Sequence, residues 1–257
     1  MRSTTLATAS GLVSFLVLAT TSLGVAQESR PIGPTARLDQ LLKRYVDAKG
    51  GVDYAAWKKN RDHEASLREA VKDFAKLETK GYSKKAKLAH WINVYNAVTL
   101  QGMLEFYPLK SIKDKVGKKF DIWKHYTFGP RKLSLNAIEH EILRPMGDPR
   151  IHAAIVCASK GCPPLRNEAY REGKLDAQLD DNVRVWLRSP IKGLKIKGKT
   201  LYLSKIFFWF GKDFGDGSRA THLRWISRYV DAKTKRALAQ KGLVVKELDW
   251  DWALNVQ

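Results

Sequence analysis

The chain has 257 residues, 44% of them hydrophobic, and it carries a formal net charge of +20. Its apolar content and eight tryptophans are enough to bury a large core, which excludes a chain too polar to fold by itself. The charge predicts attraction to anionic polymers, but the lysines lie in separate clusters that are typical of solvated loops and strand edges. The solvated-loop interpretation is therefore favoured over a dedicated polyanion groove; anionic envelope polymers are the candidate partners of the basic surface, and no specific binding of nucleic acid is expected.

The N-terminus has the three parts of a secretory signal peptide. Arg2 supplies the positive charge, residues 6–19 form an uncharged apolar stretch, and residues 24–26 are small. The apolar stretch is shorter than the roughly 20 residues that span a bilayer. We predict cleavage after about Ala26, export to the periplasm or the extracellular space, and no transmembrane segment in the mature chain. Cleavage leaves a charge of +19, because Arg2 is the only charged residue removed.

Residues 27–35 are predicted to be a disordered lead-in, and residues 36–257 one globular domain. Apolar residues at helical spacing predict helices over 36–49, within 63–77 and from Ser83 to about residue 105. Residues 120–128 favour a strand, and Ser134 is expected to cap a short helix.

The second half of the chain mixes expected strands with expected helices. Residues 150–157 form a mostly apolar run that predicts a buried strand, and a helix is expected over about 174–188. A hairpin around 198–199, a short helix after Ser204, a long helix over about 221–240 and a terminal strand follow. The fold class is α+β, with helices packed on a small mixed sheet in a single domain.

Five motifs carry a resemblance to a known family. They are "WINVYNA" (91–97), "IEHEILRP" (138–145), "DPRIHAAIVCASKGCPPL" (148–165), "LSKIFFWFGKDFG" (203–215) and "LDWDWALN" (248–255). Together they resemble the domain of unknown function DUF547, over roughly residues 50–255. The resemblance implies little about activity, although bacterial members often carry secretion signals. It marks as motif positions Asn93, Asn96, His140, Arg144, Arg150, His152, Cys157, Cys162 and Pro163.

The two cysteines, Cys157 and Cys162, allow three interpretations. A disulfide suits an oxidising compartment, although so short a loop gains only roughly 2 kcal/mol. A zinc site needs two further ligands, for which His140 and His152 are available, but the spacing is not diagnostic. A nucleophilic Cys162 is favoured by its place just beyond the expected buried strand, and a metal is the least favoured of the three.

A nucleophilic thiol needs a base and a group that orients the base. His152 and His140 are the candidate bases, and strand alternation places His152 and Cys157 on opposite faces, so that Cys162 is the expected partner. Asn93 and Asn96 share one side of a helix, where they either orient an imidazole or tie a loop to the helix. Arg144, Arg150 and Lys160 are candidate binding residues.

No phosphate-binding loop, dinucleotide fingerprint or Gly-x-Ser-x-Gly elbow is present, so no cofactor is expected. The triplet Asp213–Gly215 is interpreted as a chance match to a kinase motif. We expect thiol-dependent acyl transfer or hydrolysis of a small-molecule or peptide-like substrate, with Cys162 as nucleophile. The alternative is a non-enzymatic periplasmic or extracellular binding module with a Cys157–Cys162 disulfide and a basic surface for anionic envelope polymers.

Overall fold

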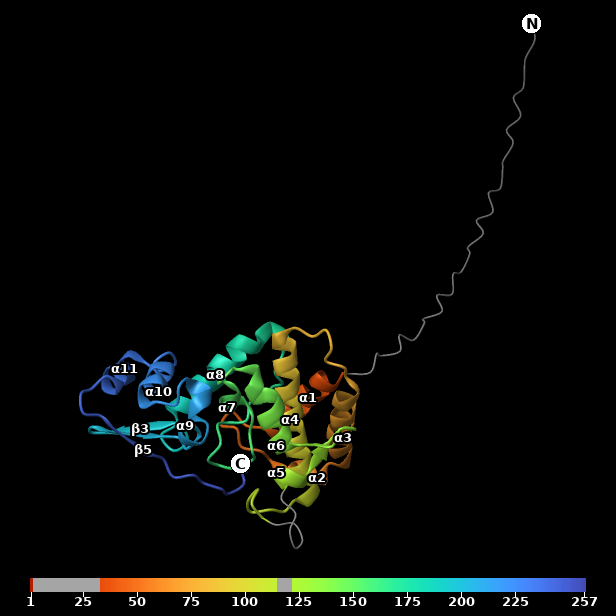
Figure 1. Cartoon of the computed structure of the whole chain (residues 1–257). Coiled ribbons are helices and arrows are strands. Elements are labelled where there is room, and N and C mark those ends of the chain that lie inside the picture. The colour runs from red at the N-terminus through yellow and green to blue at the C-terminus, as the bar shows by residue number, and fades with distance from the viewer. Residues whose placement is uncertain (2–32, 115–121) are drawn as a thin grey trace. The chain divides into compact units, whose positions relative to one another are not determined.

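A long central helix organises the first half of the protein in the computed structural model, which describes residue 1 and residues 33–114 and 122–257 (Figure 1). This helix, α4 (Lys84–Phe106), buries side chains on all sides, as expected of a helix inside a core. Ser83 caps it by accepting a hydrogen bond from the Ala86 backbone N–H, as predicted. Three helices surround it: α1 (Pro34–Tyr45), α2 (Tyr54–Lys59) and α3 (Arg61–Lys76).

The predicted signal peptide and nearly all of the predicted lead-in lie outside the described residues, apart from Met1 and residues 33–35. Helix α1 begins at Pro34, two residues before the expected start of the domain. Among the described residues, no helix has both the length and the apolar character needed to cross a membrane.

A short connecting region follows α4. It contains α5 (Ile122–His125), β1 (Thr127–Phe128), β2 (Leu133–Ser134), α6 (Leu135–Ala137), the π-helical segment η1 (Ile138–Leu143) and the 3₁₀ turn η2 (Arg144–Met146). Ser134 caps α6, as predicted. The strand expected over 120–128 is wrong over 122–125, where a helical turn places the buried Ile122 against Gly102 of α4.

The strand predicted over 150–157 is also wrong. Residues Ile151–Ala154 form the short helix α7, and the chain then runs extended to Cys157 without a neighbouring strand. The extended part obtains its hydrogen bonds from a side chain instead, because the amide of Asn96 donates to the Ala154 carbonyl and accepts from the Val156 N–H. These bonds satisfy buried backbone groups that a sheet would otherwise pair.

The second half of the chain carries a three-stranded mixed sheet at the end of the molecule away from α1 and α3 (Figure 1). The predicted hairpin is β3 (Leu194–Lys197) with β4 (Thr200–Leu203), and β5 (Val244–Glu247) lies parallel to β4. The helical segments of this half are η3 (Glu172–Lys174), α8 (Leu175–Arg188), α9 (Ile206–Trp209), η4 (Gly211–Phe214), α10 (Arg219–Ile226) and α11 (Ala232–Leu238).

The single helix predicted over 221–240 is thus two helices. Asp231 separates them because its carboxylate accepts the Thr234 N–H and so begins α11 as an N-cap.

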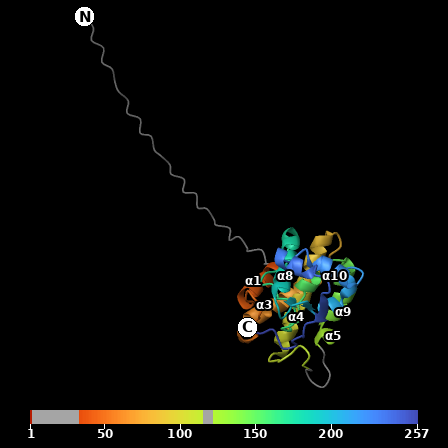
Figure 2. The same cartoon turned by 90° about the vertical axis from the view of Figure 1, so that its left-hand side faces the viewer.

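Two hydrophobic cores meet along α8. Its first half contributes Leu175 and Leu179 to the core around α4, while Val183 and Trp186 belong to the core beneath the sheet. In the turned view, α1 and α3 lie at the left, α4 lies in the middle and α9 lies at the right (Figure 2). The structure is therefore an α+β fold in which helices outnumber strands, as the sequence predicts.

Candidate functional site

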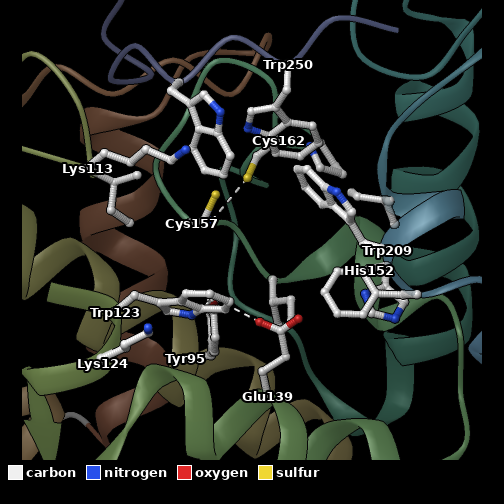
Figure 3. Close-up of a pocket in the computed structure, with 16 residues that line it drawn as sticks. Tyr95, Lys113, Trp123, Lys124, Glu139, His152, Cys157, Cys162, Trp209 and Trp250 are labelled. Carbon is white, nitrogen blue, oxygen red and sulfur yellow. Dashed lines mark hydrogen bonds between the residues drawn. The ribbon is translucent and has the colours of Figure 1, made fainter. Parts of the chain in front are cut away.

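A cavity of about 460 Å³ lies where α4, η1, α7, α9 and the C-terminal segment converge. Figure 3 shows both cysteines on one wall, with Glu139 and Tyr95 opposite them and His152 to one side. Four tryptophans line the cavity as well: Trp123, Trp209, Trp250 and Trp252. A mostly apolar hollow with a few converging polar groups is the usual form of a small-molecule site.

The cysteine loop, residues 157–162, is held against the C-terminal segment, residues 248–257. Lys160 N–H donates to the Ala253 carbonyl at 2.7 Å, and Gly161 N–H donates to the Asp251 carbonyl at 2.8 Å. Gly161 is required there, because a side chain would lie only 2.8 Å from the ring of Trp250. These contacts explain why the two C-terminal tryptophans reach the cavity that the cysteine loop lines.

The loop turns sharply between the two cysteines. Ala158 has a φ of 62°, a left-handed conformation that costs a residue with a side chain roughly 1 kcal/mol. With this turn, the Cys157 N–H donates to the Cys162 sulfur at 3.3 Å. The Ser159 hydroxyl lies 3.4 Å from the Cys162 sulfur and 3.3 Å from the Cys157 sulfur. Both sulfurs therefore share one hydroxyl group.

Both cysteines are free thiols in this structure, so the disulfide considered from the sequence is not present among the described residues. Burial raises the pKa of Cys162, but hydrogen bonds from the Cys157 thiol, Ser159 and the backbone outweigh it, and the pKa is lowered. The pKa of Cys157 is raised well above the usual value, because its thiol donates to Cys162 and is buried. The two thiols therefore differ, and Cys162 is the more acidic.

Glu139 extends from the π-helical segment η1 into the cavity, with 4% of its surface exposed. Tyr95 donates a hydrogen bond to its carboxylate at 3.3 Å, and the Trp123 indole N–H donates to the Tyr95 hydroxyl. Burial, together with the nearby Cys157 sulfur, raises the pKa of Glu139 to about 7. A carboxyl with this pKa can both donate and accept a proton near neutral pH.

His152 stands on another wall of the cavity and is oriented by Asp213. Its Nε2 lies 2.8 Å from the Asp213 carboxylate, and its ring stacks on Phe210 with centroids 4.4 Å apart. Arg144 donates two hydrogen bonds to the same carboxylate, at 2.7 and 2.8 Å. Burial lowers the pKa of His152, although the charge and hydrogen bond of Asp213 oppose the shift. Burial would raise the pKa of Asp213, but its hydrogen bonds and ion pairs with Arg144 and His152 outweigh burial and lower that pKa well below its usual range.

The structure does not assemble the thiol, imidazole and amide triad considered from the sequence. His140 lies outside the cavity lining, where its Nδ1 is 2.8 Å from Arg144. Asn93 binds the Tyr170 backbone through both atoms of its amide, and Asn96 binds Ala154 and Val156 in the same way. Both asparagines tie loops to α4, and the group that orients His152 is Asp213.

The strand-face argument for the cysteines is also wrong. It separated His152 from Cys157, but both residues line one cavity because α7 replaces the strand. Among the hydrogen bonds of the described residues, the partners of the Cys162 sulfur are Cys157 and Ser159 rather than an imidazole. Pro163 lines the cavity next to Cys162.

The three candidate binding residues have separate positions. Arg144 holds Asp213, as described above, and Arg150 pairs with three carboxylates, those of Asp148, Asp176 and Asp180. Arg150 therefore joins α7 to α8. Lys160 is exposed and lines a different hollow beside residues 47–51. Within the described residues, no group of three or more His, Cys, Asp or Glu side chains is placed to hold a metal ion.

Glu139, Asp213 and the tryptophans were not identified from the sequence as site residues. Glu139 precedes His140 within "IEHEILRP", and Asp213 lies within "LSKIFFWFGKDFG", so both belong to the motifs that carried the family resemblance. Asp213 could have been found as the single carboxylate of the aromatic motif 203–215, whereas nothing local distinguishes Glu139 from the other charged residues of its motif. A carboxylate in an aromatic motif needs a partner if it is buried.

Residues 79–187 match the family model described as "Protein of unknown function, DUF547". The match covers α4, η1, α7, the cysteine loop and α8, which together supply Tyr95, Glu139, His152 and both cysteines. The motifs at 203–215 and 248–255 lie beyond it. Neither the curated proteins nor the solved structures compared with this chain gave a match. Residues 79–187 of this chain are therefore a DUF547 domain.

Proposed function

We propose that this chain is an exported enzyme of thiol-dependent acyl transfer or hydrolysis, with the Cys162 sulfur as the nucleophile. The observation that carries the proposal is the set of hydrogen bonds that the Cys162 sulfur accepts at the wall of the cavity. Donors aimed at a sulfur favour its thiolate form, which is the nucleophilic one.

Glu139 is the proposed proton-transfer group. The Cys162 thiolate attacks the substrate carbonyl, and protonated Glu139 gives its proton to the departing alcohol, thiol or amine. A thioester on Cys162 results. Glu139, now a carboxylate, accepts a proton from the incoming water or acceptor, and the acyl group leaves Cys162. Its pKa of about 7 suits both steps near neutral pH.

His152 is the second proposed polar group of the site. Asp213 and the stacked Phe210 ring hold its imidazole in one orientation, as a carboxylate does in other nucleophilic enzymes. The aromatic walls favour a small-molecule or peptide-like substrate with an apolar or aromatic acyl part. Under this proposal, Asn93, Asn96 and His140 are positioning residues.

The test uses the mature chain, residues 27–257, with p-nitrophenyl butyrate as the probe ester. We expect a butyryl group on Cys162, detected by peptide mass analysis, and hydrolysis reduced by about 100-fold in Cys162→Ser. Cys157→Ser is the matched control and retains the acyl adduct. Hydrolysis by Cys162→Ser at the wild-type rate, or a Cys162 that an alkylating reagent does not modify in the native protein, would contradict the proposal.

The second candidate function is a non-enzymatic module that binds anionic envelope polymers. It is favoured by the outer face of the sheet, where Lys195, Tyr202 and Lys246 lie side by side across three strands and Lys197 follows on the same face. All three lysines are exposed, and no carboxylate of the described residues pairs with them. Such a row has the charge and the spacing to contact a polyanion.

Export is part of both proposals and rests on the N-terminal pattern of residues 1–26. We expect Gln27 as the first residue of the protein recovered from outside the cytoplasm. N-terminal sequencing of that protein tests the cleavage site, and an intact Met1 would contradict it.

A further inference from the structure

The second thiol of the site, Cys157, forms no covalent bond in the acyl-transfer reaction proposed above. It nevertheless lines the same cavity as Cys162 and contacts the same hydroxyl group, that of Ser159. The backbone N–H of Cys157 also donates to the Cys162 sulfur. Close placement of two free thiols beside one cavity is the geometry that thiol–disulfide exchange needs.

The two sulfurs are arranged for different roles. The Cys162 sulfur accepts hydrogen bonds from two groups, which stabilise its thiolate, whereas the Cys157 thiol donates its proton toward Cys162. In exchange reactions, the more acidic thiol attacks first, and the less acidic thiol resolves the mixed disulfide. The hydrogen bonds around the two sulfurs therefore indicate that Cys162 attacks the substrate disulfide and that Cys157 resolves the mixed disulfide.

A resolving thiol must lose its proton before it can attack. Glu139 faces the cysteine pair across the cavity in Figure 3, and the charge of Cys157 acts on its carboxyl group. The carboxyl is buried, so bulk water does not compete with it freely. Glu139 is the proton acceptor that the structure offers to Cys157.

The cavity limits which disulfides can react. Its volume of about 460 Å³ suits a small molecule, and its tryptophan walls suit an aromatic or apolar body. At its edge, the exposed Lys113 ammonium lies 3.5 Å from the ring centre of Trp252. An ammonium group at this position favours a substrate that carries a carboxylate.

We infer that Cys157 and Cys162 form a redox-active dithiol that reduces small, carboxylate-bearing disulfides in this cavity. The Cys162 thiolate attacks one sulfur of the substrate disulfide, whose S–S bond breaks and releases one thiolate. Cys157 then gives its proton to Glu139 and attacks the Cys162 sulfur, which releases the second thiolate. Two electrons pass from the dithiol to the substrate, and the protein ends with a Cys157–Cys162 disulfide.

This activity also bears on the proposed acyl transfer, because the oxidised pair has no nucleophilic sulfur. A small thiol in excess drives the same steps in reverse and restores both cysteines. The inference goes beyond the proposed function, since acyl transfer forms a covalent bond to Cys162 alone, whereas exchange forms covalent bonds to both sulfurs.

The test uses the reduced mature chain with dithiobis-nitrobenzoate, an aromatic disulfide that carries carboxylates and releases a coloured thiolate. We expect the wild type to release two thiolates per protein and to lose two hydrogens in mass without keeping an adduct. Cys157→Ser should release one thiolate and keep a mixed disulfide on Cys162. Cys162→Ser should react at least about tenfold more slowly.

Glu139→Gln tests the proton acceptor, with Glu141→Gln as the control from the same helical segment. We expect Glu139→Gln to slow the second release relative to the first by about tenfold, and Glu141→Gln to leave this ratio unchanged. A stable adduct on the wild type, or no release at all, would overturn the inference. Because butyrylation of Cys162 is measured separately, failure of the exchange can be distinguished from failure of the proposed acyl transfer.

Discussion

Glu139 shows how a single residue can make stability depend on pH. Burial raises the pKa of this carboxyl from 4.5 to about 7 in the folded protein. The folded state therefore binds the proton more tightly than the unfolded state does. The stabilisation from this proton is complete below pH 4.5 and is lost as the pH rises through 7. A shift of this size corresponds to roughly 3 kcal/mol.

We therefore expect Glu139→Gln to be more stable than the wild type above pH 7, by up to roughly 3 kcal/mol, with the difference vanishing near pH 4. The glutamine still offers Tyr95 an acceptor, so the contact is kept. Urea unfolding across this pH range measures the difference. Glu141→Gln, from the exposed side of the same segment, should follow the wild-type profile, and the same profile for Glu139→Gln would refute the prediction.

At the scale of elements, Asn96 joins α4 to the segment that ends at Cys157. Its buried amide makes hydrogen bonds to the Ala154 carbonyl and the Val156 N–H. The Asn96 amide supplies the hydrogen bonds that the backbone of a neighbouring strand would supply in a sheet. The position of the cysteine loop therefore depends on a residue some 60 positions earlier in the chain.

Removing this amide should destabilise the protein and loosen the loop. We expect Asn96→Ala to lower the free energy of unfolding by about 3 kcal/mol, because two buried backbone groups lose their partners. The cysteines should also react faster with an alkylating reagent under native conditions. Asn167→Ala removes an exposed asparagine and serves as the control. Equal stability of the two variants would show that the Asn96 bonds are not needed.

At the scale of the whole molecule, the net charge is +20, and the lysine row of the sheet (Lys195, Lys197 and Lys246) is one part of it. We expect Lys195→Gln, Lys197→Gln and Lys246→Gln together to weaken binding to dextran sulfate about tenfold at low salt, and to make binding less dependent on salt. The control replaces the exposed Lys59, Lys80 and Lys84, with the same loss of charge. Equal weakening by both sets would assign the binding to net charge alone.

Local patterns predicted much of the fold because the responsible forces act within one element. Ser83 and Ser134 begin helices by accepting backbone hydrogen bonds three residues ahead, and the hairpin of β3 and β4 depends on its turn. The run 150–157 was assigned wrongly for the converse reason. Its apolar residues fit either a buried strand or a buried helix, and the choice was made by contacts with α4 and α8.

The sequence by itself determined the α+β class, and it marked Cys157 and Cys162 as candidate site residues. Only the tertiary structure decided which groups surround them. Glu139, Asp213 and Trp250 come from distant parts of the chain, and their roles depend on burial and on partners that no local pattern records. A pKa is set by the three-dimensional surroundings of a group, so the sequence could name candidate residues but could not show which groups surround them.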